Sequence, residues 1–395
     1  MGHILFSDKY NVEFDDNNIK INDVVIADDE KKELSNEDFA KQKMREFYSN
    51  FLSKQFDNIV ILSGAGTSVG IGTDEEHKGK TMRELWQVVV DRIGINKLRK
   101  FAKNIKIDEN RINEEYVDLE WLISKANMCE KVEHNEEVEK QLIVIEKLIK
   151  ENCRLTLPPD APHIAFLRKI TARKLKYSRV KIFTLNYDLL FEQAASEGAY
   201  VVIDGFSFSN PRIFKGTNYD YDIIIRNANS AKTEENYAPK VFHLYKPHGS
   251  LDWDSEIISE DEKRFIKKDN PQNPVMIYPS SSKFEYSYEQ PYFEMMSRLQ
   301  QELRSRNTLL IAIGFSFYDK HIKAMVMEAL DVNMSITLII VSPSVECKDS
   351  FTDFKKKINS NGNIVLIAEK FSDFVVHYPY SEIYDYTNLG VQNVE

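Results

Sequence analysis

The sequence predicts an α/β fold, with a Rossmann-like parallel sheet, helices on both of its faces and an inserted helical bundle. Three observations support this prediction. Short, almost entirely apolar segments, such as VKIFTLN, TLLIAIG and ITLIIVS, alternate with helix-like segments through the second half of the chain. A similar segment, NIVILS at residues 58–63, stands nearer the start and ends at glycines. A long charged stretch with apolar residues at helical spacing lies between them. Apolar strands that alternate with helices are typical of a parallel sheet covered on both faces.

The chain begins with a segment whose role the sequence does not define. Residues 1–34 mix short strand-like pieces with charged runs, and we interpret them as an N-terminal arm. From Ser35 the pattern becomes helical, because Ser35 and Asp38 have the spacing of a capping box and apolar residues follow at helical intervals. Residues 35–395 are expected to form one large domain.

Two insertions are expected within this domain. From about residue 75 to 175, apolar stripes recur at helical spacing, for example at Val138, Leu142 and Ile145, which predicts an inserted helical bundle. The stretch at about 205–240 is an ill-defined loop and is expected to be a loop insertion. The later strands are expected in VVIDG, KVFHLYKP, PVMIY and NIVLIA.

Composition limits the class of protein. The 395 residues are 42% hydrophobic, which allows a sizeable core, and no apolar run approaches the roughly 18 to 20 residues that cross a bilayer. The net charge of −10 offers no basic face to nucleic acid. Cys129, Cys153 and Cys347 form no CxxC pair, so neither a disulfide framework nor a zinc ribbon is indicated. We expect a cytoplasmic protein without a membrane anchor.

The first motif is Gly64-Ala65-Gly66-Thr67-Ser68, directly after the strand at 58–63. Glycines at this point allow backbone N–H groups to approach a diphosphate closely. An ordinary tight turn explains the motif equally well. The dehydrogenase fingerprint is not met, because Val69 occupies the position of its third glycine, and this disfavours hydride transfer.

The second motif is Thr184-Leu185-Asn186-Tyr187-Asp188, at the carboxyl end of a predicted strand. This is the edge of an α/β sheet at which ligands bind. The carboxamide of Asn186 can hold a ribose hydroxyl or a water, and Asp188 can orient the loop. Alternatively, either side chain simply caps the helix that follows.

The third motif is Lys246-Pro247-His248-Gly249-Ser250, which also closes a predicted strand. Histidine titrates near neutrality and can accept a proton from a hydroxyl or a water. Gly249 is interpreted as leaving room for a ligand beside His248. A lone histidine is more often a structural group, and His248 is singled out by its place in the motif.

In this order, the three motifs together resemble the sirtuin family. Ile313-Gly314-Phe315-Ser316 is similar to that family's later glycine-serine loop, and residues 339–343 are similar to its next adenine-side strand. The resemblance implies NAD binding by Gly64, Ala65, Gly66, Thr67, Ser68 and Asp188, with Gly314 and Ser316 beside the adenine ribose. It also implies that Asn186 and His248 face the nicotinamide ribose and are the catalytic residues.

Two departures from the deacylases of this family bear on function. Their Ile-Pro-Asp-Phe-Arg loop is missing, since Gly72 is followed by TDEEHKGK, so no residue can be assigned to the nicotinamide pocket from this loop. No paired cysteines follow Gly249, and a structural zinc needs about four Cys or His ligands. We expect no zinc and no acyl-lysine groove, which leaves water as the nucleophile.

These observations predict an NAD hydrolase that releases ADP-ribose and nicotinamide. KPHGSLDW and IGFSFYDKHI resemble the sirtuin-like antiphage effectors that pair with a HerA-like ATPase, which implies self-association and such a partner. Two alternatives remain open. One is a catalytically silent NAD or ADP-ribose binding module that serves as a sensor or scaffold. The other is a protein deacylase or ADP-ribosyltransferase.

Overall fold

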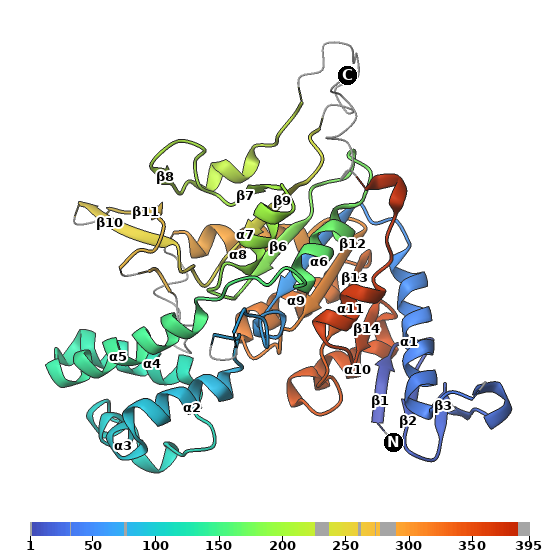
Figure 1. Cartoon of the computed structure of the whole chain (residues 1–395), viewed down its shortest axis with the longest axis horizontal. Helices are drawn as coiled ribbons and strands as arrows, with labels where there is room; N and C mark the ends of the chain where they lie inside the picture. The colour runs from blue at the N-terminus through green and yellow to red at the C-terminus, as the bar shows by residue number, and fades with distance from the viewer. Residues whose placement is uncertain are drawn as a thin grey trace.

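The computed structural model describes residues 2–31, 33–74, 77–225, 237–259, 262–272, 274–276 and 290–385. Parallel strands form the centre of one large sheet, as predicted (Figure 1). They are β5 (Asn58–Ser63), β6 (Lys181–Thr184), β7 (Val201–Ile203), β9 (Val241–Tyr245), β12 (Thr308–Ile313), β13 (Ile336–Val341) and β14 (Ile364–Ile367). Their order in the sheet is β14-β13-β12-β5-β6-β9-β7, and each adjacent pair is parallel.

The strand order contains a switch point beside β5. From β5 the chain builds the sheet outward through β6 to β9 and β7, and it then returns to add β12 on the other side of β5. In open α/β sheets, ligands bind at the carboxyl ends of the strands where the strand order reverses. The ends of β5 and β12 are therefore the expected centre of a binding site.

The N-terminal segment, predicted to be an arm, extends the same sheet. It forms β1 (Gly2–Phe6), β2 (Val12–Phe14), β3 (Ile19–Ile21) and β4 (Val24–Val25). Strand β1 pairs antiparallel with β14, and β2, β3 and β4 follow as antiparallel neighbours. One apolar side chain from each of the first three strands, Leu5, Val12 and Ile19, is fully buried. Burial of these side chains makes the segment part of the sheet rather than a detached arm.

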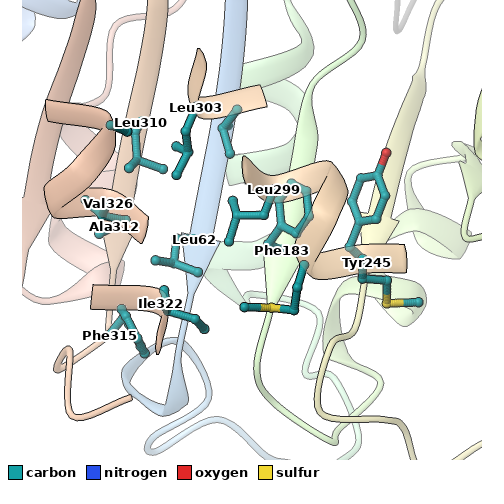
Figure 2. Packing of buried hydrophobic residues seen from close by; sticks show 14 of the residues in the cluster. Leu62, Phe183, Tyr245, Leu299, Leu303, Leu310, Ala312, Phe315, Ile322 and Val326 are labelled. Atoms are coloured by element: carbon teal, nitrogen blue, oxygen red, sulfur yellow. The ribbon is translucent and has the colours of Figure 1, made fainter. Parts of the chain in front are cut away.

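Helices cover both faces of the sheet. Helices α1 (Asn36–Leu52), α6 (Pro162–Thr171), α7 (Leu190–Glu197) and α11 (Phe371–His377) share one hydrophobic cluster with one face of the strands. Helices α8 (Tyr292–Arg304), α9 (Lys320–Val332) and α10 (Thr352–Asn361) share another cluster with the opposite face. Figure 2 shows Leu299 and Leu303 of α8 packed over strand residues that include Leu62 and Phe183. Alternate residues of each strand thus face opposite clusters, which confirms the predicted Rossmann-like architecture.

The inserted helices form a bundle to one side of the sheet (Figure 1). The bundle consists of α2 (Met82–Ile93), α3 (Ile95–Asn104), α4 (Leu119–Glu133) and α5 (Glu136–Cys153), which share a hydrophobic cluster of their own. A capping box between Thr81 and Glu84 begins α2. Helix α6, which lies inside the range predicted for the insertion, packs instead with α7 and α11 on the main sheet. The structural insertion therefore ends near the end of α5.

A second, smaller sheet is antiparallel. It contains β8 (Arg212–Ile213), β10 (Trp253–Ser259) and β11 (Glu262–Lys267) in the order β10-β11-β8. Strand β8 comes from the stretch predicted as a loop insertion, of which residues 226–236 lie outside the described part. Within the described ranges, no helix is both long and apolar enough to cross a bilayer.

Candidate functional site

Two glycine loops interlock at the switch point. The N–H of Gly66, after β5, donates to the carbonyl of Gly314, after β12, at 2.9 Å. A Cβ on Gly66 would lie 2.6 Å from Gly314 Cα, and Gly314 itself has a φ of +62°. Only residues without a side chain allow the two backbones to come this close. The structure thus brings Gly64–Ser68 and Gly314 together, and it gives the glycines a packing role that the sequence did not reveal.

The first glycine loop retains an exposed face. The N–H groups of Gly66, Thr67 and Ser68 all donate to protein carbonyls, so these amides are already bonded. Ala65 is exposed, and its N–H forms no hydrogen bond within the described residues. This N–H is therefore available to an oxygen of a bound diphosphate.

Asn186 lies at the end of β6 and is held against the first glycine loop. Its Nδ2 donates to Gly64 O at 3.1 Å, Thr67 Oγ1 at 3.1 Å and Ser68 Oγ at 2.8 Å. Because a backbone carbonyl can only accept, the contact with Gly64 determines which way the amide faces. The other amide atom, Oδ1, forms no hydrogen bond with the described residues and the side chain is only half-buried. A ligand hydroxyl or a water can donate to this oxygen.

Asp188 contacts both the first glycine loop and the start of the next helix. Its Oδ2 accepts from Ser68 Oγ at 2.6 Å, and its Oδ1 accepts from the N–H of Leu190 at the start of α7 at 3.1 Å. Asp188 therefore contacts both the loop and the first residue of α7, although the N-cap of that helix is Leu189. Ser68 Oγ also accepts from Asn186 Nδ2. The two consecutive hydrogen bonds, from Asn186 to Ser68 and from Ser68 to Asp188, therefore fix the Asn186 carboxamide.

His248 follows β9 and is almost fully buried, with 3% of its surface exposed. Its Nε2 lies 3.4 Å from Asp319 Oδ2, and the Asp319 side chain is 5% exposed. Asp319 is also the N-cap of α9, where its Oδ1 accepts from the N–H groups of His321 and Ile322. A carboxylate at this distance stabilises the protonated imidazole.

Gly249 does not leave room for a ligand, and that part of the sequence interpretation is wrong. A Cβ at Gly249 would lie 2.1 Å from the carbonyl oxygen of Val275, and the residue has a φ of +87°. The space beside Gly249 is filled by the chain segment at Val275, whose carbonyl accepts from the N–H of Ser250. The glycine is needed for this backbone crossing.

The remaining predicted site residue, Ser316, lies in the loop between β12 and α9. It is half-buried, and its hydroxyl forms no hydrogen bond in the part of the chain that the structure describes. The predicted residues thus gather at the carboxyl ends of the adjacent strands β12, β5, β6 and β9. The roles assigned to them remain predictions.

Buried charges support the loop that carries His248. Lys267 of β11 lies 2.9 Å from Asp204 Oδ2 and 3.1 Å from Asp252 Oδ2. Ser250 donates to the other oxygen of Asp252 at 2.6 Å. Burial alone would raise the pKa of Asp252, but Lys267 and Lys246 outweigh it and lower that pKa. Burial alone would likewise lower the pKa of Lys267, but Asp204 and Asp252 outweigh it and raise that pKa.

The sequence analysis did not identify Asp319, or the charged cluster of Asp204, Asp252 and Lys267, as part of the candidate site. Asp319 carried one usable signal, since an aspartate directly before an amphipathic run is a good N-cap and it follows the Gly314 loop closely. Asp204, Asp252 and Lys267 carried none, because they come from separate segments that meet only in the fold.

Metal ligands and reactive thiols would each add chemistry to the protein. No group of three or more His, Cys, Asp or Glu side chains that could hold a metal ion occurs among the described residues. All three cysteines are unpaired thiols. Burial raises the pKa of Cys153 to about 12, which leaves this thiol protonated and unreactive at neutral pH.

A family model described as SIR2-like domain matches residues 180–361. The matched segment includes Asn186, His248, Gly314 and Asp319, whereas the first glycine loop precedes it. No curated protein matches the chain. The match supports a sirtuin-like family and suggests an enzyme that uses NAD.

Proposed function

We propose that this protein is an NAD hydrolase that cleaves the nicotinamide–ribose bond with water and releases ADP-ribose and nicotinamide. The observation that most supports this proposal is the hydrogen bonding of the Asn186 carboxamide. Three protein acceptors hold its amide nitrogen, while Oδ1 has no protein donor among the described residues. Such an oxygen is suited to accept a hydrogen bond from a ribose hydroxyl or from the attacking water.

The residues present fit a dinucleotide. The N–H of Ala65, an exposed residue, can bond a diphosphate oxygen, and the hydroxyl of Ser316 on the neighbouring loop can bond a ribose. Both lie at the switch point of the sheet, where dinucleotides bind in Rossmann-like folds. Asn186 and His248 extend the site along the sheet toward β6 and β9.

Bond cleavage requires little covalent chemistry from the protein. Departure of nicotinamide neutralises its pyridinium charge and leaves positive charge on the ribose. Asn186 Oδ1 orients the ribose or the water, and His248 accepts the proton of the water as it attacks. Asp319 stabilises the imidazolium that forms, because its carboxylate lies 3.4 Å from Nε2.

Two features favour water over an acyl-lysine as the nucleophile. The chain has three scattered cysteines, which cannot supply the four ligands of a structural zinc. The segment after Gly249, where the deacylases carry paired cysteines, instead forms the β10–β11 hairpin. Ion pairs of Lys267 with Asp204 and Asp252 hold this hairpin in place.

The test is incubation of the purified protein with NAD in water enriched in oxygen-18, followed by chromatography and mass spectrometry. We expect nicotinamide and ADP-ribose that carries one heavy oxygen. Products that appear only with an acyl-lysine peptide would replace this proposal with a deacylase. NAD binding without any product would identify a silent sensor.

The cellular role that we propose is that of a cytoplasmic antiphage effector. In this role the protein self-associates, depletes NAD during infection and is controlled by a HerA-like ATPase. This rests on the resemblance of KPHGSLDW and IGFSFYDKHI to such effectors. Light scattering at micromolar concentration and co-purification with such an ATPase test it. A monomer that is fully active alone would contradict it.

A further inference from the structure

A buried ammonium joins the two loops of the proposed catalytic residues, in addition to the backbone hydrogen bond from the N–H of Leu251 to the carbonyl of Tyr187. Lys246 directly precedes Pro247 and His248, and it is 2% exposed. Its Nζ donates to the carbonyls of Tyr187, at 3.4 Å, and of Asp188, which are the residues that follow Asn186. Its third acceptor is Glu192 Oε1 on α7, at 3.1 Å. The backbone of Lys246 therefore begins the His248 loop while its side chain holds the Asn186 loop.

The geometry at Lys246 suits lysine in particular. An ammonium has three donors at a single point, and here three acceptors surround it. The planar guanidinium of arginine would place its donors farther out and in one plane. Among the described residues, Glu192 supplies the carboxylate within ion-pair distance of Lys246, at 3.1 Å.

Glu192 depends on Lys246 in turn. Its Oε2 is buried without a hydrogen bond in the described chain, and burial raises the pKa of the carboxyl although Lys246 opposes this. Removing Lys246 alone would take the contacting cation away from a buried carboxylate and leave it only the electrostatic influence of Lys267, which is unfavourable. Replacing both partners by apolar side chains removes this penalty, but it still removes the ammonium donor from the carbonyl of Asp188, whereas the carbonyl of Tyr187 keeps the N–H of Leu251 at 3.1 Å.

From this arrangement we infer that Lys246 is a positioning residue that sets the placement of Asn186 relative to His248, with Glu192 as its counter-ion. This inference rests on the proposed function for its kinetic consequence. A one-ångström displacement of a catalytic group can cost about 10²-fold in rate. Ligand binding at the Gly64 and Gly314 loops does not involve Lys246 and remains intact.

The experiment compares Lys246→Met, the double variant Lys246→Met/Glu192→Met and Lys246→Arg with the parent. The single Met variant is expected to melt at a clearly lower temperature, and the double variant is expected to recover most of that loss. The single and the double Met variants should both retain KM for NAD within about threefold and lose kcat by roughly 10- to 100-fold. Recovery of kcat together with thermal stability in the double variant would reduce Lys246 to a structural ion-pair partner and overturn the inference.

A second measurement separates this inference from the proposed function. Amide hydrogen exchange on the double variant should accelerate at residues 186–190 and 247–251, while β12 and β13 keep their protection. Unchanged exchange at both loops would overturn the inference even if NAD is hydrolysed. Faster exchange in a protein whose parent form does not hydrolyse NAD would uphold the connection between the loops and refute the hydrolase.

Discussion

At the scale of single residues, the site depends on polar atoms that are directed by other polar atoms. Asn186 is fixed through Ser68 and Asp188, and His248 is paired with Asp319. In each case a polar neighbour determines how the proposed catalytic group is oriented. This arrangement makes removal of the reacting group separable from loss of binding.

The first prediction concerns Asn186 and His248. His248→Ala removes the proposed base and should lower kcat by about 10² to 10⁴. Asn186→Ala removes a preorganised contact and should lower kcat by on the order of 10². Both variants should keep most of their NAD affinity in calorimetric titration, because the loop residues proposed to bind the diphosphate are not replaced and the interlocked backbones of Gly66 and Gly314 remain. A folded His248→Ala variant with the parental rate would show that the histidine has no chemical role.

The second prediction separates the two roles of Asp319. Asparagine caps helices as well as aspartate, so Asp319→Asn should leave the start of α9 intact and remove only the charge beside His248. We expect kcat to fall by at least about tenfold with an unchanged melting temperature. Asp319→Ala is the matched control, since it should lose the same activity and also about 1 kcal/mol of stability. Full activity in Asp319→Asn would contradict a role for the carboxylate.

At the scale of elements, the interlocked glycine loops join strands that are far apart in sequence. Gly66 and Gly314 meet because β5 and β12 are adjacent and parallel. Ala65, next to this contact, is exposed. Packing therefore falls on Gly66, and the proposed ligand contact falls on its neighbour Ala65.

The third prediction compares these neighbours. Ala65→Trp should obstruct the dinucleotide and weaken NAD binding by more than about tenfold, or about 1.4 kcal/mol, at an unchanged melting temperature. Gly66→Val should lose both binding and stability, because its Cβ would lie 2.6 Å from Gly314 Cα. Calorimetry and thermal melts distinguish the two. Undiminished NAD binding by Ala65→Trp would place the diphosphate elsewhere.

At the scale of the whole molecule, buried histidines make stability depend on pH. His163 is fully buried between Phe191 and Phe371, and its ring nitrogens have no hydrogen-bond partner among the described residues. Burial lowers the pKa of His163 to about 3 and, with Lys181, lowers that of His243 to about 4. The native state therefore keeps both rings neutral at pH values at which the unfolded chain protonates them.

The fourth prediction follows from this difference. As pH falls below about 6.5, each histidine should reduce the free energy of unfolding by about 1.4 kcal/mol per pH unit, until its folded pKa is reached. Urea unfolding between pH 7.5 and 5 measures the slope. Carboxylates that titrate in this range add to the slope, so the parent is compared with His163→Phe. In this variant the free energy of unfolding should change by about 1.4 kcal/mol less per pH unit. Equal slopes in the two proteins would contradict the assignment.

The sequence by itself determined the local features of this protein. Apolar strands, helix caps and the glycine and strand-end motifs depend on residues close together in the chain, so the parallel sheet and the positions of Asn186, His248 and Gly314 could be predicted. The place of residues 2–25 in the sheet, the Gly66–Gly314 contact and the pairing of His248 with Asp319 were decided by the tertiary structure. Each of these joins segments that are distant in sequence, and one sequence contains no record of which distant backbones meet. Gly249 shows the same limit, because its glycine serves a backbone crossing by Val275 that no local pattern announces.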